Sequence, residues 1–240
     1  IVVASGKGGV GKSTIAANLS FAFARRGLKV GLLDADITGP SLPTLLGAAE
    51  RPSTRDGKIA PVERHGVSAM SIGYLVDADK AVAWRGPMVM GAVRQLIGDV
   101  AWGALDVLIV DTPPGTSDAH LTLAQSGIVS GVVIVSTPQK LALADVRRGA
   151  ALFSGVGASI LGVIENMAWI ETPKGPAPLF GEGGAARLAA EIGAPFLGAL
   201  PLWPDLAAAS DAGAPLPPDH AASLAFDAIA AALALALRLD

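Results

Sequence analysis

The chain has 240 residues, of which 51% are hydrophobic and 16% charged, and its formal net charge is −3. This weakly acidic balance offers no general attraction to nucleic acid or to anionic lipid. The chain contains no cysteine, which excludes disulfide bonds and thiolate metal sites within it and suits a reducing compartment. We therefore expect a cytoplasmic protein with neither nucleic acid nor a membrane among its partners.

Apolar, β-branched runs alternate with segments of helical spacing along the chain. The apolar runs predict strands at 1–4, 29–33, 67–72, 105–110, 131–136, 159–164 and 195–200. The helical spacing predicts helices at 13–26, 87–102, 118–126, 141–154, 185–192 and 220–239. Continuous Val, Ile and Leu strands joined by helices indicate an α/β fold, in which helices cover both faces of a mostly parallel sheet of about seven strands.

This pattern predicts one three-layer domain over residues 1–240. Segments 51–65 and 170–184 interrupt the alternation, and we expect both to be surface excursions. The last helix is rich in Ala and Leu, but its charged residues leave an apolar stretch too short to span a bilayer, so we expect it to dock on the sheet. Because Ile1 already lies in a predicted strand and no initiator methionine precedes it, we expect the native N-terminus to be truncated.

A phosphate-binding loop joins the first predicted strand to the first predicted helix. Residues 6–13 read Gly-Lys-Gly-Gly-Val-Gly-Lys-Ser and fit the pattern G-x-x-x-x-G-K-S. Glycines let successive backbone N–H groups turn around a phosphate, while the start of the helix directs the positive end of its dipole at the same anion. We expect Lys12 to reach the β- and γ-phosphates of a nucleotide and Ser13 to ligate Mg²⁺. The predicted nucleotide-binding residues are Gly6, Gly8, Gly9, Val10, Gly11, Lys12, Ser13 and Thr14.

A second lysine lies inside the glycine-rich loop. Residues 7–13 resemble the deviant Walker A signature K-G-G-x-G-K-[ST]. In proteins with that signature the additional lysine crosses a dimer interface to the nucleotide of the partner subunit. The resemblance therefore implies a catalytic role in trans for Lys7, and the alternative is an ordinary solvated lysine on a loop.

Acidic residues follow two of the predicted strands at the edge of the sheet where ligands gather. Asp34 and Asp36 follow the second strand, and Asp111 ends the strand predicted at 105–110. We expect Asp36 to orient the attacking water, Asp34 to lie nearer the metal or the hydrogen-bond network, and Asp111 to bind Mg²⁺ through water. The alternative for Asp34 and Asp36 is a plain acidic turn. Lys7, Lys12 and Asp36 are thus the predicted catalytic residues of an ATPase.

Six short motifs together resemble the Mrp/ApbC family of P-loop ATPases, which carry iron–sulfur clusters. They occupy residues 34–41, 84–88, 111–116, 136–139, 165–167 and 180–184, and the likeness extends from residue 1 to about residue 215. The resemblance implies a homodimer that holds ATP and Mg²⁺ between its subunits and serves apo iron–sulfur client proteins. It also implies that Asn166 binds the edge of adenine through its side-chain amide and that Pro201 packs on the base.

The chain departs from that family at the residues that bind the cluster. Family members usually carry C-P-x-C shortly after the Asn-Met pair, and Thr172 and Gly175 stand in register with those two cysteines. A threonine hydroxyl is a poor iron ligand and glycine has no side chain, whereas iron–sulfur clusters require thiolates. The sequence therefore predicts complete ATP-binding machinery and a degenerate cluster site.

Two other functions remain open at this stage. The first is a cluster-free adaptor ATPase that resembles the Mrp family, which the missing cysteines favour. The second is a positioning switch of the ParA/MinD type, in which the ATP state controls binding to DNA, a membrane or a partner. The negative net charge and the absence of a basic tail count against the second.

Overall fold

The computed structural model describes residues 1–37, 39–48, 50–55, 57–76, 86–115, 118–155 and 157–239. Four residues of the motifs named above, Thr38, Trp84, Arg85 and Thr116, lie outside the described residues.

The centre of the fold is an eight-stranded sheet in the order β12-β9-β8-β1-β7-β2-β6-β5. All neighbouring strands pair in parallel except β5 and β6, which are antiparallel. The strands of this sheet are β1 (Val2–Ser5), β2 (Val30–Asp34), β5 (Val62–Arg64), β6 (Val67–Ser71), β7 (Val107–Asp111), β8 (Val132–Ser136), β9 (Ile160–Glu165) and β12 (Phe196–Ala199). The predicted mostly parallel sheet is confirmed, with β5 as an additional edge strand.

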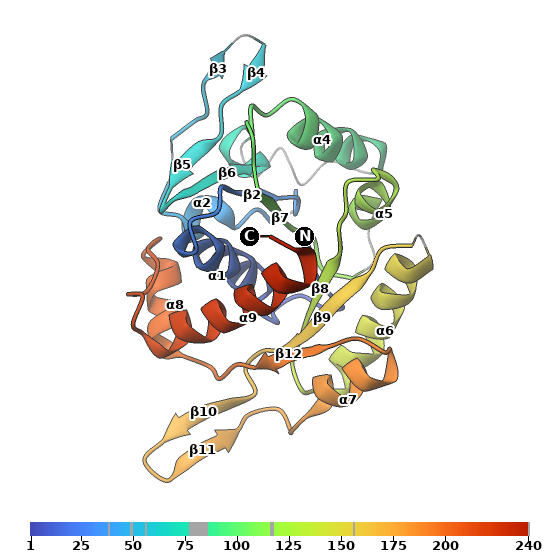
Figure 1. Cartoon of the computed structure of the whole chain (residues 1–240), viewed down its shortest axis with the longest axis vertical. Helices are drawn as coiled ribbons and strands as arrows, with labels where there is room; N and C mark the ends of the chain where they lie inside the picture. The colour runs from blue at the N-terminus through green and yellow to red at the C-terminus, as the bar shows by residue number, and fades with distance from the viewer. Residues whose placement is uncertain are drawn as a thin grey trace.

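Helices pack on both faces of this sheet (Figure 1). Helices α1 and α9 pack together on one face, and α4, α5, α6 and α7 form a connected layer on the other. The helices are α1 (Lys12–Arg25), α2 (Leu42–Leu45), α4 (Gly86–Gly98), α5 (Asp118–Gln125), α6 (Lys140–Gly155), α7 (Gly184–Glu191), α8 (Pro204–Asp211) and α9 (Ala221–Leu237), with a 3₁₀ turn η1 (Ile72–Tyr74). The three-layer α/β fold is confirmed. In the described part of the chain, no helix combines the length and apolarity needed to cross a bilayer.

The buried strands form the core because their side chains are apolar on both faces. All residues of β1, β2 and β8 are buried, as a parallel sheet covered on both sides requires. The last helix, α9, packs along α1, and an exposed ion pair between Arg25 and Asp227 joins the two helices at 2.7 Å. This helix was expected to dock on the sheet, and it packs mainly against α1, with a smaller contact to the edge strand β12.

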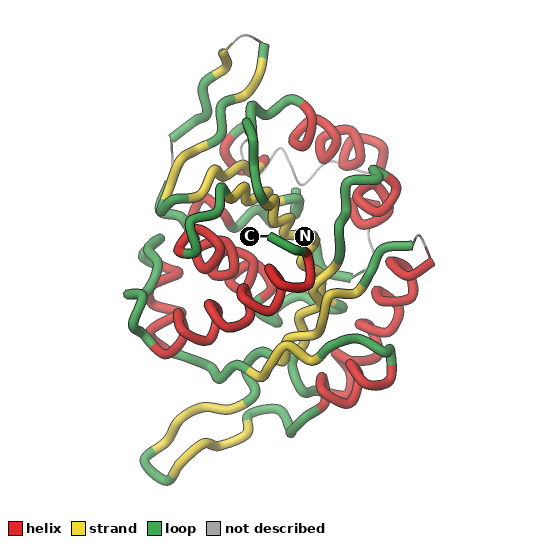
Figure 2. Tube along the Cα trace, in the orientation of Figure 1, coloured by secondary structure: helices red, strands yellow, loops and turns green. Residues whose placement is uncertain are grey.

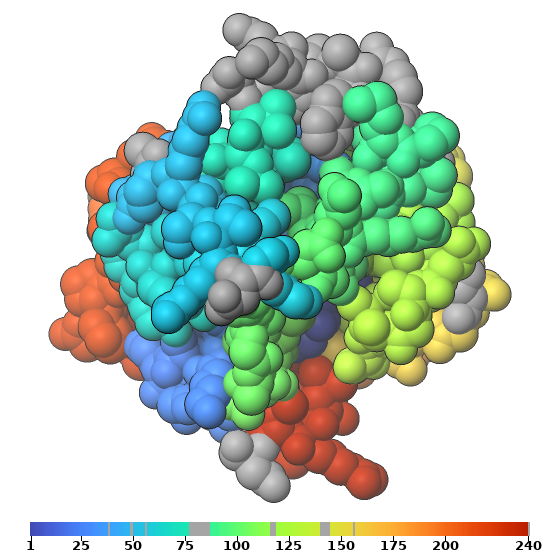
Figure 3. Space-filling model, turned by 90° about the horizontal axis from the view of Figure 1, so that it is seen from above, coloured from blue at the N-terminus to red at the C-terminus, as the bar shows by residue number. Residues whose placement is uncertain are grey.

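Two hairpins lie in the segments that were expected to be surface excursions (Figure 2), although the end of the first segment, Val62–Arg64, belongs to the central sheet. The first pairs β3 (Thr54–Arg55) with β4 (Lys58–Ile59), and the second pairs β10 (Trp169–Thr172) with β11 (Gly175–Pro178). The first hairpin is fixed at the end of α4, because Ile59 N donates to Asp99 O at 2.9 Å and Lys58 Nζ donates to Gly98 O at 2.8 Å. Figure 3 shows this cyan hairpin lying next to the green segment that contains α4.

Candidate nucleotide site

The phosphate-binding loop lies between β1 and α1 at the carboxyl edge of the sheet. Gly9 and Gly11 have φ angles of +77° and +82°, a region that glycine adopts without strain. Gly11 is the N-cap of α1 and supplies no side-chain hydrogen bond, and the first turn of α1 contains no acidic residue. Among the described residues, the first N–H groups of α1 therefore have no side-chain acceptor from the cap, as an anion-binding helix start requires.

Gly6 lets the loop pack directly on helix α6. A Cβ atom at Gly6 would lie 2.5 Å from Val146 N and 2.6 Å from Asp145 Cβ. Any larger residue would push the loop away from α6, so this position needs glycine for packing as well as for the turn. The position of the phosphate-binding loop is thus fixed by the first strand on one side and by α6 on the other.

A buried ion pair links the loop to the strand β7. Lys12 Nζ contacts Asp111 Oδ1, and the two side chains are only 7% and 0% exposed. Lys12 Nζ also lies 3.4 Å from Ser13 Oγ. Burial raises the pKa of Asp111, while Lys12 opposes that rise. The structure thus brings together the three residues that were predicted to handle the phosphates and the metal.

The second carboxylate oxygen of Asp111 is a candidate metal contact. Asp111 Oδ2 is buried and has no hydrogen-bond partner among the described residues. An orphaned acceptor costs free energy unless a cation or an ordered water satisfies it. In the described part of the chain, no group of three or more His, Cys, Asp or Glu residues could hold a metal ion. Mg²⁺ commonly needs only one or two protein ligands beside phosphate oxygens and waters, so Ser13 and Asp111 fit this ion.

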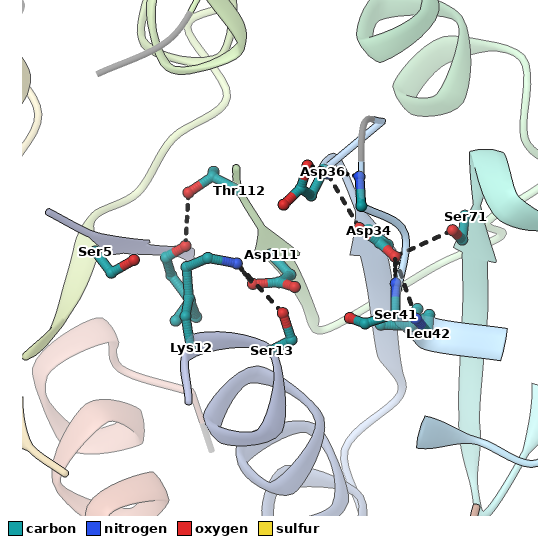
Figure 4. A network of polar contacts seen from close by, with 12 residues as sticks. Ser5, Lys12, Ser13, Asp34, Asp36, Ser41, Leu42, Ser71, Asp111 and Thr112 are labelled. Carbon is teal, nitrogen blue, oxygen red and sulfur yellow. Dashed lines mark hydrogen bonds and ion pairs between the residues drawn. The ribbon is translucent and has the colours of Figure 1, made fainter. Parts of the chain in front are cut away.

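Asp34 anchors the loop that follows β2 (Figure 4). Its carboxylate is completely buried, and Asp34 Oδ2 accepts from Ser41 N at 2.9 Å, Leu42 N at 3.2 Å and Ser71 Oγ at 3.1 Å. Asp34 Oδ1 accepts from Asp36 N at 3.0 Å. Of the two roles predicted for Asp34, the geometry supports the one in the hydrogen-bond network.

Burial and the nearby carboxylate of Asp111 raise the pKa of Asp34 to about 7, although its backbone donors lower it. The two residues are paired in register on the adjacent strands β2 and β7. Proximity of two buried carboxylates disfavours the doubly ionised state, so a cation between the strand ends would favour ionisation of both.

Asp36 and Lys7 lie around the same edge of the sheet. Asp36 Oδ1 accepts from Gly39 N at 3.2 Å, which shapes the turn after the anchored segment. Figure 4 shows Asp36 above Asp34, at the strand ends that also carry Asp111. Lys7 is half-buried, and Ser5 Oγ donates to Lys7 O at 2.9 Å. No acidic partner for the Lys7 ammonium is found among the described residues, so its charge is available to an anion.

A cavity of about 230 Å³ lies next to the phosphate-binding loop, and we refer to it as the nucleotide cavity. Asn166 and Pro201 both line it, as do residues from two elements that the sequence did not predict, Leu45 of α2 and Leu206 of α8. Asn166 Nδ2 donates to Val10 O at 2.9 Å, which connects the wall of the nucleotide cavity to the phosphate-binding loop. Pro204 at the start of α8 and Asp205 in its first turn were the available signals for that helix.

The two degenerate cluster positions face each other in the β10–β11 hairpin. Thr172 and Gly175 are paired in register, and Thr172 Oγ1 donates to Gly175 O at 2.7 Å. Lys174 N donates to Thr172 Oγ1 at 3.2 Å. The hydroxyl is therefore used inside the turn, and position 175 offers no side chain. These residues do not fit an iron–sulfur cluster.

Comparison with known proteins identifies the family. The family model described as ParA, NUBPL iron-transfer P-loop NTPase, matches residues 1–234. The chain belongs to this family. Iron-sulfur cluster carrier protein of Synechocystis sp. is 46% identical over 245 residues, covering 98% of this chain and 69% of the relative. The protein of the same name from Pseudomonas fragi is 52% identical over 220 residues, covering 90% of this chain and 77% of the relative.

Among solved structures, a nucleotide-binding protein from Archaeoglobus fulgidus in complex with ADP is similar to this chain. It superposes with a TM-score of 0.77 at 42% identity, covering 88% of this chain and 85% of the other. The expected resemblance to iron–sulfur carriers with a P-loop is thereby confirmed. In this chain, the phosphate-binding loop has the strand–loop–helix context that was predicted for it.

Proposed function

We propose that this protein binds and hydrolyses ATP with Mg²⁺, as a homodimer that serves iron–sulfur client proteins. The observation that carries the proposal is the buried pair of Lys12 and Asp111 beside the phosphate-binding loop, with no partner for Asp111 Oδ2 among the described residues. Membership of the iron-transfer family supports the client class. A cytoplasmic location stays a prediction from composition.

Each residue of the site has a defined task in this reaction. The N–H groups of the loop and of the start of α1 bind the phosphates, and Lys12 exchanges Asp111 for the β- and γ-phosphate oxygens. Ser13 and, through water, Asp111 would hold Mg²⁺, which would supply positive charge against the phosphate oxygens. Asp36 orients the attacking water. Lys7 from the partner subunit stabilises the transition-state charge.

Release of phosphate in the presence and absence of Mg²⁺ tests the reaction. We expect ATP-dependent phosphate release that disappears with a Mg²⁺ chelator, and a loss of about 100-fold or more in Lys12→Ala because charge stabilisation dominates phosphoryl transfer. Lys29→Ala, which changes a lysine outside the loop, serves as the matched control. Release that persists undiminished in Lys12→Ala would overturn the assignment.

The β10–β11 hairpin favours a second function, that of a cluster-free adaptor. Thr172 and Gly175 close the hairpin with their own hydrogen bond and provide no thiolate. On this proposal the ATP state controls partner binding while no cluster is held at the hairpin. Anaerobic reconstitution with iron and sulfide, followed by absorbance and iron counting, tests it. We expect that no stable cluster forms. A stable cluster in stoichiometric amount relative to the protein would favour the ordinary carrier function instead.

A further inference from the structure

A second cavity lies at the base of the β10–β11 hairpin. Its volume is about 450 Å³, within the range of ligand sites. The hairpin, α7 and the edge strand β12 contribute its walls, and it shares no lining residue with the nucleotide cavity. Its apolar lining includes Ala168, Trp169, Pro176, Pro178, Ala186 and Phe196.

One buried carboxylate lies in this apolar wall. Glu165, the last residue of β9, lines the cavity and is only 2% exposed. Glu165 Oε2 accepts from Ala185 N at 2.7 Å, and no donor to Glu165 Oε1 is found among the described residues. Glu165 Oε1 is not among the fully buried side-chain atoms that lack a partner, so this oxygen is open to the cavity and can accept from a donor on a ligand. The structure thus leaves a place for a cationic group at the side of the cavity.

The charged residues that line the cavity are acidic, whereas the Arg187 guanidinium lies just outside the lining, with Nη1 3.4 Å from a Cβ placed on Gly183. Its lining contains Glu165 and Glu182 but neither lysine nor arginine. A ligand that complements this lining has an apolar body and a positive charge. A ligand with a free carboxylate or phosphate suits this lining less well, because the buried carboxylate of Glu165 repels like charge.

The surroundings of the cavity favour an extended peptide over a small molecule. Strand β12 pairs with β9 on one side and ends the strand order of the sheet, so its other edge can accept a further strand. Phe196 of β12 is 41% exposed, as is Phe180, which follows the hairpin. Exposed aromatic side chains beside a cavity are typical of protein-binding surfaces.

We propose that this cavity docks an extended segment of a partner protein that carries an apolar side chain next to a lysine or arginine. The apolar side chain fills the space between Trp169 and Ala186, and the cation reaches Glu165 Oε1. The inference goes beyond the proposed function, because it concerns a partner site that is separate from the nucleotide.

A pair of capped synthetic peptides tests the proposal by NMR titration of the isotope-labelled full chain. One peptide has the sequence Leu-Phe-Arg-Leu, and the other carries neutral citrulline in place of arginine. We expect shifts of the backbone amides of Ala168, Ala186 and Phe196. We also expect about tenfold tighter binding of the arginine peptide, because hydrogen bonds to a charged group are among the stronger ones.

Matched variants separate the charge from the fold. Glu165→Gln keeps an oxygen for Ala185 N and is expected to abolish the preference for arginine, whereas Glu63→Gln on the opposite edge strand β5 keeps it. Ala186→Phe fills the cavity from α7 and is expected to block both peptides, which tests the site even if Glu165→Gln does not fold.

Three results would overturn the proposal. The first is equal binding of the two peptides, or no binding at millimolar concentration. The second is amide shifts that lie away from the cavity. The third is conversion of a dimer to a monomer by Phe196→Ser, which would show that a second copy of the chain covers the cavity.

Discussion

Glu165 and Asn166 are consecutive residues whose side chains line two different cavities. The segment that carries them forms a wall between the proposed docking cavity and the nucleotide cavity. This wall is held by backbone hydrogen bonds to the next segment, from Leu200 N to Glu165 O at 2.7 Å and from Ala168 N to Leu200 O at 2.9 Å. Met167, the next residue of this segment, has a φ angle of +54°, which is uncommon for a residue other than glycine.

Because the two cavities share this wall, we predict that a ligand bound in one cavity changes the affinity of the other cavity for its ligand. We expect ADP to change the dissociation constant of the arginine peptide by about fivefold, and the peptide to change that of ADP by the same factor, since coupling free energies are reciprocal. Calorimetric titration of each ligand with and without the other measures both factors. Identical dissociation constants with and without the second ligand would show that the two cavities are not coupled.

The ion pair of Lys12 and Asp111 predicts a stability effect of mutation in the nucleotide-free protein. Lys12→Ala leaves a fully buried carboxylate without its cation, and we expect a loss of about 3 kcal/mol in the free energy of unfolding at pH 8. Urea unfolding of the two proteins measures the loss. Lys12→Ala together with Asp111→Asn removes both charges and is expected to recover most of it, and a double variant as unstable as the single one contradicts the ion-pair account.

Asp34 predicts a pH dependence of stability. Its folded-state pKa is raised from 3.8 to about 7, so the folded protein binds this proton more tightly than the unfolded chain. The contribution of Asp34 to the free energy of unfolding therefore falls as the pH rises from about 4 to about 7.

Asp34→Asn removes this titration. The difference in the free energy of unfolding between Asp34→Asn and the parent protein should therefore move in favour of the variant as the pH rises from 5 to 8. Denaturant unfolding of both proteins at these two pH values measures this change. A stability difference that is the same at both pH values would show that Asp34 is not responsible.

Two glycines allow α8 to close over the nucleotide cavity. Gly213 follows α8 with a φ angle of +68°, and a Cβ atom there would overlap the backbone of Gly47 after α2. Gly213→Ala is expected to displace α8 and to weaken ADP binding by about tenfold, because the helix supplies part of the cavity wall. Gly193→Ala has a similar φ angle of +68° but open space around it, and it serves as the control. Equal ADP affinities of the two variants would contradict the packing argument.

The sequence predicted the elements that are long and strongly patterned. All seven predicted strands belong to the sheet, because buried parallel strands are continuous apolar runs. The edge strand Val62–Arg64 was missed, since it is three residues long and partly charged. The helix Pro204–Asp211 was missed because it is only eight residues long and, apart from Leu206, offers mainly alanines, which give no clear apolar stripe.

The candidate site was predictable where a motif fixes the chemistry. Lys12, Ser13 and Asp111 come together because the loop and the end of β7 share one edge of the sheet. The anchoring role of Asp34 depends on Ser41 and Ser71, whose contacts arise only in the folded chain. The cavity beside Glu165 likewise needs three distant elements, so no local pattern could indicate it.

Lys7 provides the most direct test of the central proposal, a dimer that hydrolyses ATP with a lysine donated by the partner. The measurement is ATP-dependent dimerisation and phosphate release of Lys7→Ala beside the parent protein and Lys29→Ala. Loss of a charge donated in trans can lower the rate of phosphoryl transfer by roughly 10³-fold. The account predicts that Lys7→Ala still binds ATP but neither dimerises with it nor releases phosphate at more than a small fraction of the parent rate. Full dimerisation and full phosphate release in Lys7→Ala would contradict it.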